Sequence, residues 1–317
     1  MKKGIYLIVS SLLVFFLLSS CSQKDTSLKT IGIIQIVEDI ELDRGREALI
    51  SLLKDSGFVD GKNIKINYQN AQGEISNIPM IINQFKTNKV DLIITITTPC
   101  TIAAAQLIKD IPIVFSIAFS PEQMGSKDYG KNIYGSYDPY NIEDFGSLIK
   151  EVLPNKFRVG LPYNSTEVNA NYSRNKIKKD LSAAGFEVVD MNVNTSNDLL
   201  QVAQALIQKN IDMFMVGADN VVTLALPSLV KIANENKKPI FTTEASNIEK
   251  GAAIGFGTDY KLWGQESGKI AVKILKGEEA QSTEIVGKRL YINLSAAQAQ
   301  GLIISDNLIN RADKVIK

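Results

Sequence analysis

Histidine is absent from this 317-residue chain, and its absence removes several classes of active site at once. Without an imidazole there is no Ser-His-Asp or Cys-His triad, no zinc site built on paired histidines and no imidazole base. Basic charge is not in excess either, because 35 Lys and Arg residues face 34 Asp and Glu residues. A nucleic-acid interface needs a surplus of Lys and Arg on one face. We therefore expect no metal site and no nucleic-acid partner.

Nucleotide-binding motifs are missing as well. The chain contains no G-x-x-x-x-G-K-[ST] sequence, and Gly255-Phe256-Gly257 is only a fragment of a dinucleotide-binding loop. We therefore expect no cofactor.

Carboxylates at strand ends, of which Glu38 and Asp219 are the clearest pair, have the chemistry of an acid/base pair. Nothing in the local sequence makes them more than polar residues, so the sequence favours a binding protein over an enzyme.

Cysteine is scarce, and the first of the two lies in a segment that resembles a bacterial lipoprotein signal. Two lysines precede a mostly apolar run from Ile5 to Leu18, which is short for a membrane span and typical of a secretory signal. The run ends in Leu-Leu-Ser-Ser-Cys at residues 17–21, which resembles the lipobox. The resemblance implies that residues 1–20 are removed and that Cys21 is lipidated. The exported protein would then be anchored to the bacterial cell membrane, facing the periplasm or the cell exterior. The alternative is an ordinary cleaved signal in which Cys21 is incidental.

With Cys21 lipidated, Cys100 has no partner, so we expect a fold without a disulfide. A lone thiol at a helix N-terminus is a candidate for reactivity, because the helix dipole lowers its pKa. The alternative is that the Cys100 side chain is buried and inert, and this is what we expect. Residues 21–29 are polar and without pattern, which is typical of a flexible tether.

From Thr30 onward, short apolar strands alternate with amphipathic helices. Hydrophobic residues make up 45% of the chain and charged residues 22%, as in a folded globular protein. The first unit has four expected strands separated by helices, which favours a parallel sheet with right-handed crossovers. Strands are expected at 31–37, 63–68, 90–96 and 113–117, and helices at 42–56, 75–87 and 101–109.

The same alternation then begins again. Strands are expected at 158–161, 187–193, 213–216 and 240–242, and helices at 141–153, 168–184, 198–209 and 221–236. The tail adds strands at 252–256 and 289–293 and a helix at 260–275. The two units are joined near residues 119–137, a stretch rich in Gly, Pro, Ser and Asp.

We therefore expect an α/β protein of two doubly wound parallel-sheet lobes connected by a hinge. Lobe 1 is expected to comprise residues 30–120 and about 257–286. Lobe 2 is expected to comprise about 136–256 and 287–317. The tail contributes to both lobes, so the chain must cross between them more than once.

In open α/β sheets, ligands bind beyond the carboxyl ends of the strands. Each strand read to its end yields polar candidates: Glu38, Thr97, Thr98, Ser120, Tyr163, Asn164, Asp219, Asn220 and Glu244. The alternative reading is that the Ser, Thr, Asn and Asp residues cap the helices that follow. The two readings are compatible, because a helix N-terminus with free amides is also a site for a carboxylate.

Short motifs also recur in a fixed order between about residues 31 and 303. They include I-G-I-I-Q-I-V-E at 31–38, N-A-Q-G at 70–73, T-T-P at 97–99, I-P-I-V-F-S at 111–116, Y-N-S-T-E-V-N at 163–169, A-D-N at 218–220 and G-x-x-x-G at 264–268. Together they resemble a bacterial family of ABC-transporter substrate-binding lipoproteins of the tryptophan- and tyrosine-binding type. The chain has Glu38-Asp39 where that family commonly has Glu-His, and Ser120-Pro121 where it has Asp-Pro. The ligand can therefore differ from tryptophan.

The resemblance implies a fold like that of type I periplasmic binding proteins, with an aromatic or branched amino acid held in the interlobe cleft by hinge closure. The implied partners are an ABC permease and its ATPase. Helix N-termini after Thr98 and Asn164 would hold the ligand carboxylate, and Asp219 and Glu38 its ammonium group. Asn169, which closes one motif, is a further candidate, and Tyr163 or Tyr172 could stack on an aromatic side chain. The alternatives are a sensor or a purine- or sugar-binding lipoprotein of the same fold, an enzyme and a surface adhesin.

Overall fold

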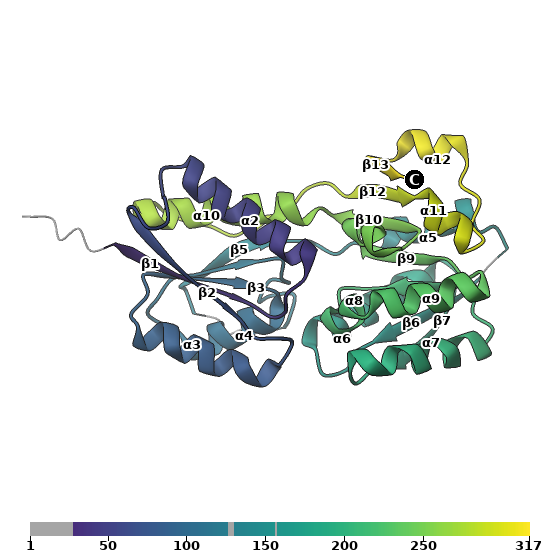
Figure 1. Ribbon diagram of the computed structural model, residues 1–317, viewed down its shortest axis with the longest axis horizontal. Coiled ribbons are helices and arrows are strands. Elements are labelled where there is room, and N and C mark those ends of the chain that lie inside the picture. Colours follow the sequence, from purple (N-terminus) through teal and green to yellow (C-terminus); the bar gives the residue numbers. More distant parts are fainter. Residues whose placement is uncertain (1–27, 126–129, 156) are drawn as a thin grey trace, which may run out of the picture.

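The computed structural model describes residues 28–125, 130–155 and 157–317, and Cys21 with the expected signal segment lies outside this range. Two sheets lie side by side along the long axis of the molecule, each covered by helices (Figure 1). The expected α/β class with two mostly parallel sheets is confirmed. None of the helices in the described ranges is long and apolar enough to cross a bilayer.

The first sheet contains six strands, and we call it with its helices lobe 1. Its strands are β1 (Lys29–Gln35), β2 (Ile64–Asn70), β3 (Leu92–Ile96), β4 (Ile113–Ser116), β5 (Ile133–Tyr137) and β11 (Thr283–Glu284). They are ordered β11-β5-β4-β3-β1-β2, and every pair of neighbours is parallel. The helices are α2 (Ile40–Asp55), the 3-10 turn Ile75–Asn77, α3 (Ile78–Thr87), α4 (Thr98–Leu107) and α10 (Tyr260–Lys276).

The second sheet contains seven strands and forms lobe 2. Its strands are β6 (Arg158–Tyr163), β7 (Glu187–Asn192), β8 (Met213–Val216), β9 (Ile240–Glu244), β10 (Ile254–Thr258), β12 (Arg289–Asn293) and β13 (Lys314–Ile316). Their order is β13-β12-β10-β9-β8-β6-β7, with β10 and β12 antiparallel. The helices are α5 (Glu143–Val152), α6 (Val168–Ala183), α7 (Leu199–Gln208), α8 (Asn220–Leu224), α9 (Leu226–Asn236), α11 (Leu294–Ala299) and α12 (Asp306–Arg311), with 3-10 turns Ser196–Asp198 and η3 (Ala245–Lys250).

Two details differ from the sequence-based expectation. The single helix expected at 221–236 is two helices, α8 and α9, which meet at Ala225. Pro227 lies in the first turn of α9, where its missing N–H is tolerated, whereas one continuous helix would need that N–H for a hydrogen bond. The segment 119–137, expected to be a surface connection, contains β5, which adds a strand to the first sheet.

Within the described residues the chain passes between the two sheets three times: after β5, after β10 and after β11. Several short connections at one side of a cleft are the usual construction of a hinge. We propose that these three passages form the hinge between the lobes.

The G-x-x-x-G motif of α10 allows this helix to lie directly against α2 (Figure 1). A Cβ on Gly264 would lie only 1.9 Å from the carbonyl oxygen of Gly45, and a Cβ on Gly268 would lie 2.9 Å from Leu52 Cδ2. Any larger residue at Gly264 would push the two backbones apart. Because α10 begins beside the cleft, this contact fixes its first turn, which carries Tyr260 and Trp263, against lobe 1.

Candidate functional site

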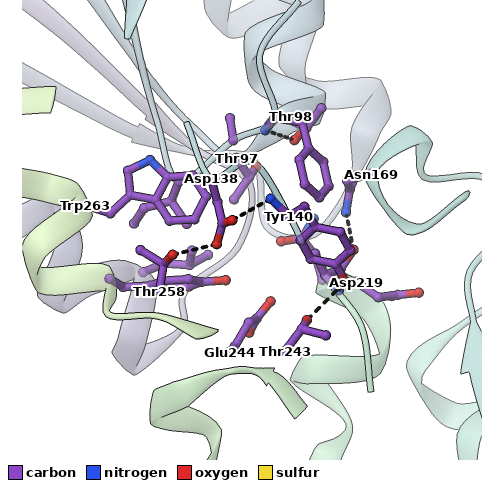
Figure 2. Close-up of a pocket in the computed structure, with 17 residues that line it drawn as sticks. Thr97, Thr98, Asp138, Tyr140, Asn169, Asp219, Thr243, Glu244, Thr258 and Trp263 are labelled. Carbon is purple, nitrogen blue, oxygen red and sulfur yellow. Dashed lines mark hydrogen bonds between the residues drawn. The ribbon is translucent and has the colours of Figure 1, made fainter. Parts of the chain in front are cut away.

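A pocket lies between the two lobes, where strands of both sheets end. It holds about 500 Å³ of space when its open mouth is counted. Its apolar and aromatic wall is formed by Leu42, Ile117, Ala118, Phe119, Tyr140, Ala218, Tyr260 and Trp263. Its polar lining consists of Thr97, Thr98, Asp138, Asn169, Asp219, Asn220, Thr243, Glu244 and Thr258. Figure 2 shows Trp263 and Thr258 on one side of this space and Asn169 and Asp219 on the other.

Backbone strain is concentrated at this pocket. Thr97, Ile117 and Tyr140 have φ values of +83°, +50° and +53°, although none of them is a glycine. A positive φ is a genuine outlier for β-branched residues such as Thr and Ile. Such conformations cost free energy and persist where the surrounding structure enforces them, most often at binding sites. Thr97 and Ile117 directly follow strands of lobe 1, whereas Tyr140 lies on the passage after β5 and packs in the core of lobe 2, so the strain lies where the chain enters the pocket from lobe 1.

Asp219 is buried at the start of α8 and accepts two backbone hydrogen bonds. Its Oδ1 accepts from Val222 N at 2.9 Å, which is a capping bond, and its Oδ2 accepts from Asn164 N at 2.6 Å. Burial, together with the nearby charge of Glu167, raises the pKa of Asp219 to about 7. The side chain therefore caps α8 and also presents a carboxylate to the pocket.

Glu244, at the end of β9, is a second acidic group of the pocket. Its Oε2 accepts from Asn247 Nδ2 at 3.0 Å, and it interacts with the hydroxyl of Tyr260 from lobe 1. Burial raises the pKa of Glu244 to about 7. Among the described residues that line the pocket there are three carboxylates and neither Lys nor Arg. The site is thus suited to a ligand that brings a positive charge.

The third carboxylate, Asp138, connects two of the passages between the lobes. Its Oδ1 accepts from Tyr140 N at 2.6 Å, and its Oδ2 accepts from Thr258 Oγ1 at 2.5 Å (Figure 2). Sequence reasoning missed Asp138 and Thr258. The sequence pattern does not predict the strand β5 that precedes Asp138, so it indicates no strand end at this position.

A hydroxyl network around Tyr140 holds the lobe 2 wall together. The Tyr140 hydroxyl is hydrogen-bonded to Ser173 Oγ and to Thr243 Oγ1, the latter at 3.1 Å. Ala218 N donates to both hydroxyl oxygens, of Ser173 at 3.0 Å and of Tyr140 at 3.2 Å. Burial raises the pKa of Tyr140, so the phenol remains protonated. The backbone next to Asp219 is therefore fixed by two side chains, one from α6 and one from the passage after β5.

Ion pairs also cross from lobe 1 to lobe 2 at the N-terminal end of α2. Asp39, which caps α2, pairs with Lys250 of η3, and Arg44 Nη2 lies 2.7 Å from Glu249 Oε2. Both side chains of the Asp39–Lys250 pair are largely buried. These contacts hold the lobes together beside the pocket.

Six of the ten residues that the sequence nominated for ligand binding line the pocket: Thr97, Thr98, Asn169, Asp219, Asn220 and Glu244. The other four do not.

Glu38 is exposed. Tyr163 packs against Arg174, whose guanidinium carbon lies 4.7 Å from the centre of the tyrosine ring. Ser120 is buried in a turn, where its Oγ accepts from Gln123 N at 3.3 Å. Asn164 lines a neighbouring groove, but its N–H holds Asp219. Tyr172 packs on Phe119, with 4.7 Å between the ring centres.

Cys100 is a buried free cysteine, as expected from the sequence. Burial raises the pKa of its thiol to about 12. The side chain is therefore unreactive at neutral pH even though it lies in the first turn of α4.

Comparison with known proteins gives a consistent result. A family model described as ABC transporter substrate binding protein matches residues 30–316. The tyrosine-binding protein of Clostridioides difficile (strain R20291) is 34% identical over 294 residues, which cover 87% of this chain and 85% of that protein.

Solved structures agree with this result. A Streptococcus pneumonia ABC domain in complex with L-Trp has a TM-score of 0.84 at 26% identity and covers 92% of this chain and 100% of its own. The ligand-free, open structure of a Clostridium difficile substrate-binding protein with adhesive properties has a TM-score of 0.68 at 34% identity, covering 92% and 99%. The overall arrangement is thus closer to the L-Trp complex, although the sequence is closer to the open protein.

Proposed function

This chain belongs to the family of ABC transporter substrate-binding proteins, and we propose that it binds the zwitterion of an aromatic or branched amino acid between its lobes. The observation that carries the choice of ligand is the pairing of buried carboxylates with an aromatic wall in one pocket. Asp219 and Glu244 have raised pKa values because they are buried without a cation in the described lining. A ligand ammonium group would supply that cation.

The ligand carboxylate has a natural partner in lobe 1. The ten-residue helix α4 begins at Thr98, and its first N–H groups have no partner within the helix. Thr98 Oγ1 accepts from Phe119 N at 3.0 Å, which leaves the hydroxyl proton available for a ligand oxygen. The strained φ of Thr97 positions this turn. We propose that Thr97, Thr98 and the start of α4 bind the carboxylate.

The ligand side chain would lie against the rings. Tyr260 and Trp263 pack edge to face, with 5.9 Å between their ring centres, and Phe119 and Tyr140 do the same at 5.0 Å. Aromatic ligands gain most from such a wall, because edge and face contacts add to the burial of apolar area. The names of the relatives, one a tyrosine-binding protein and one a complex with L-Trp, support the same class.

The ligand class can be tested by a thermal-shift screen of the twenty amino acids with purines and simple sugars as controls. A ligand that binds only the folded protein must raise its melting temperature. We expect tyrosine, tryptophan or another aromatic or branched amino acid to give the largest shift. A shift with a purine or sugar and with none of the amino acids would refute the proposal.

We also propose that Cys21 is lipidated, that the protein acts outside the cytoplasm with an ABC permease and ATPase, and that it catalyses no reaction on its ligand. A Cys21→Ser variant should leave the membrane fraction and lose the mass of the lipid. An unchanged mass and location would exclude the anchor.

A further inference from the structure

Glu167 lines the groove next to the pocket rather than the pocket itself, and two residues of the pocket lining are hydrogen-bonded to its carboxylate. It occupies the N-cap position of α6 and is only 3% exposed. In the described structure its side chain makes no capping bond to its own helix. Instead, Oε2 accepts from Asn169 Nδ2 at 2.9 Å and from both N and Nδ2 of Asn220 at 3.0 Å. The carboxylate therefore joins the first turn of α6 to the start of α8.

The contacts of Asn169 determine which way its amide faces. Asn169 Nδ2 donates to Glu167 Oε2 and, at 3.1 Å, to the carbonyl oxygen of Ala218. Both partners are acceptors, so a rotated amide would bring its oxygen against two other oxygens. The observed orientation is thus imposed by the surroundings. It leaves Oδ1 as the atom of the amide that is free for a ligand.

This Oδ1 is the unusual feature of the site. Asn169 is 5% exposed and lines the pocket, and within the described residues its Oδ1 is buried without a hydrogen-bond partner. A buried acceptor without a donor costs free energy, whereas a donor on a bound ligand would recover it. Lobe 2 therefore offers a ligand two kinds of hydrogen-bond acceptor, the neutral Oδ1 of Asn169 and the carboxylate of Asp219.

We propose that Glu167 is a positioning residue for ligand recognition, which holds the Asn169 amide so that Oδ1 accepts a hydrogen bond from the ligand ammonium group. This inference rests on the proposed function, because it requires a ligand with an N–H donor. An ammonium group has three N–H donors, so it can use Asn169 in addition to the carboxylates. The arrangement would favour amino acids over analogues that lack the amino group.

Two variants separate the hydrogen-bonding role of Glu167 from its charge. Glu167→Gln keeps an acceptor oxygen for Asn169 and Asn220 but removes the negative charge. Glu167→Met keeps the length of the side chain and removes the acceptor. Affinities would be measured by calorimetry for L-tyrosine and L-tryptophan, and for 3-(4-hydroxyphenyl)propanoate and indole-3-propanoate, which lack the amino group.

We expect Glu167→Met to weaken amino-acid binding about tenfold or more and to change binding of the deaminated analogues about twofold or less. Glu167→Gln should remain within about threefold of the wild type for all four ligands. If Glu167→Gln loses as much amino-acid affinity as Glu167→Met, the charge of Glu167 acts and the positioning role is refuted. Equal losses for ligands with and without the amino group would also refute it.

The double variant Glu167→Met/Asn169→Ala provides the decisive control. If Glu167 acts through Asn169, the double variant should bind L-tyrosine no more weakly than Asn169→Ala alone, whereas independent roles give losses that add. Additive losses would overturn the proposal.

If the wild-type protein binds neither L-tyrosine nor L-tryptophan, the proposed ligand class fails, and the positioning role fails with it. If the wild type binds and Glu167→Met binds equally well, only the positioning role fails.

Discussion

The two lobes bring different chemistry to the pocket. Lobe 1 contributes hydroxyl groups, a helix N-terminus and apolar or aromatic side chains, represented by Thr98, Tyr260 and Trp263. Lobe 2 contributes the acids and amides, represented by Asp219, Glu244 and Asn169. Apart from Asp138 on the passage after β5, the described lining residues of lobe 1 carry no charge.

This asymmetry indicates how an amino acid would be divided between the lobes. Under the proposed function, its ammonium group would bind the carboxylates of lobe 2, and its carboxylate and side chain would lie against α4 and α10 of lobe 1. Neither lobe satisfies both ends of the zwitterion, so full binding requires that the lobes close on the ligand. The ion pairs between α2 and η3 then add to the contacts that hold the lobes together.

The largest expected effect comes from removing charge on the lobe 2 side. Asp219→Asn should weaken binding of the amino acid by about thirtyfold or more, because losing one partner of a desolvated charge pair costs roughly 2–5 kcal/mol. The amide that replaces the carboxylate has one acceptor oxygen for the two backbone N–H groups that Asp219 binds. Below pH 7, where Asp219 is itself neutral in the folded protein, stability should therefore fall by about 1 kcal/mol as well. Calorimetry and thermal unfolding of the ligand-free protein measure the two effects separately.

A matched control for Asp219→Asn is Asp190→Asn, because Asp190 is paired with Arg174 and Lys178 outside the pocket. The control should bind as tightly as the wild type. If Asp219→Asn also binds as tightly, the ammonium group lies at Glu244 or elsewhere, and the division between the lobes is incorrect.

The pH dependence of affinity should also arise from lobe 2. Both Asp219 and Glu244 have pKa values raised to about 7 by burial, so acidification below pH 7 protonates them in the ligand-free protein. Binding of an ammonium group requires them ionised. Affinity should therefore fall between pH 8 and pH 6 by about tenfold for each carboxyl whose ionisation binding requires, and by about a hundredfold if binding requires both. A flat calorimetric profile over this range would show that these carboxylates do not bind the ligand charge.

Stability of the ligand-free protein should change in the opposite direction. The pKa values of these carboxyls are higher in the folded protein than their ordinary values of 3.8 and 4.5, so the folded state binds more protons in between. Their contribution to stability is present at low pH and is lost as the pH rises through about 7. The melting temperature should fall less steeply between pH 5 and pH 8 in Asp219→Asn than in the wild type.

A smaller effect is expected from the hydroxyl of lobe 1. Thr98→Ala should weaken amino-acid binding by roughly threefold to tenfold, because one hydrogen bond is lost while the N-terminal amides of α4 remain. Thr98→Ser keeps the hydroxyl and should bind nearly as well as the wild type. A loss in Thr98→Ala as large as that in Asp219→Asn would mean that the two lobes contribute equally to binding of the charged groups.

Much of the fold could be predicted from the sequence, because apolar runs of strand length alternate with helical patterns over both halves. The strand at Ile133–Tyr137 was not recognised, since its tyrosines, glycine and serine resemble a loop and its pairing with β4 is a tertiary contact. The break between α8 and α9 was within reach of the sequence, because Pro227 marks it. The return of α10 to lobe 1 was expected, but the close contact of Gly264 with Gly45 depends on the packing of distant segments.

The pocket lining was predictable where a polar residue closely follows a recognised strand. Thr97, Thr98, Asp219 and Glu244 line the pocket and follow strands that the sequence predicts. Asp138 lies on the passage after β5, and Thr258 is the last residue of β10, two residues beyond the end that the sequence predicts for this strand. Only the three-dimensional structure shows that the two meet at the pocket. The sequence does not indicate Glu167, because the positioning role that we propose for it depends on how the Asn169 amide is oriented in the folded protein.

The smallest expected effect concerns Glu38, which the sequence nominated as an ammonium ligand from lobe 1. The strand β1 ends at Gln35, and the chain then turns so that Asp39 caps α2 while Glu38 is exposed. An exposed carboxylate outside the pocket interacts weakly with a ligand charge, because water and salt screen it. Glu38→Gln should therefore change amino-acid affinity by less than about twofold, with Asp219→Asn measured alongside as the sensitive variant. A loss of tenfold or more by calorimetry at physiological salt would place a charged ligand contact on lobe 1. The separation of charge onto lobe 2 would then be wrong, and the lobes would share the ammonium group between them.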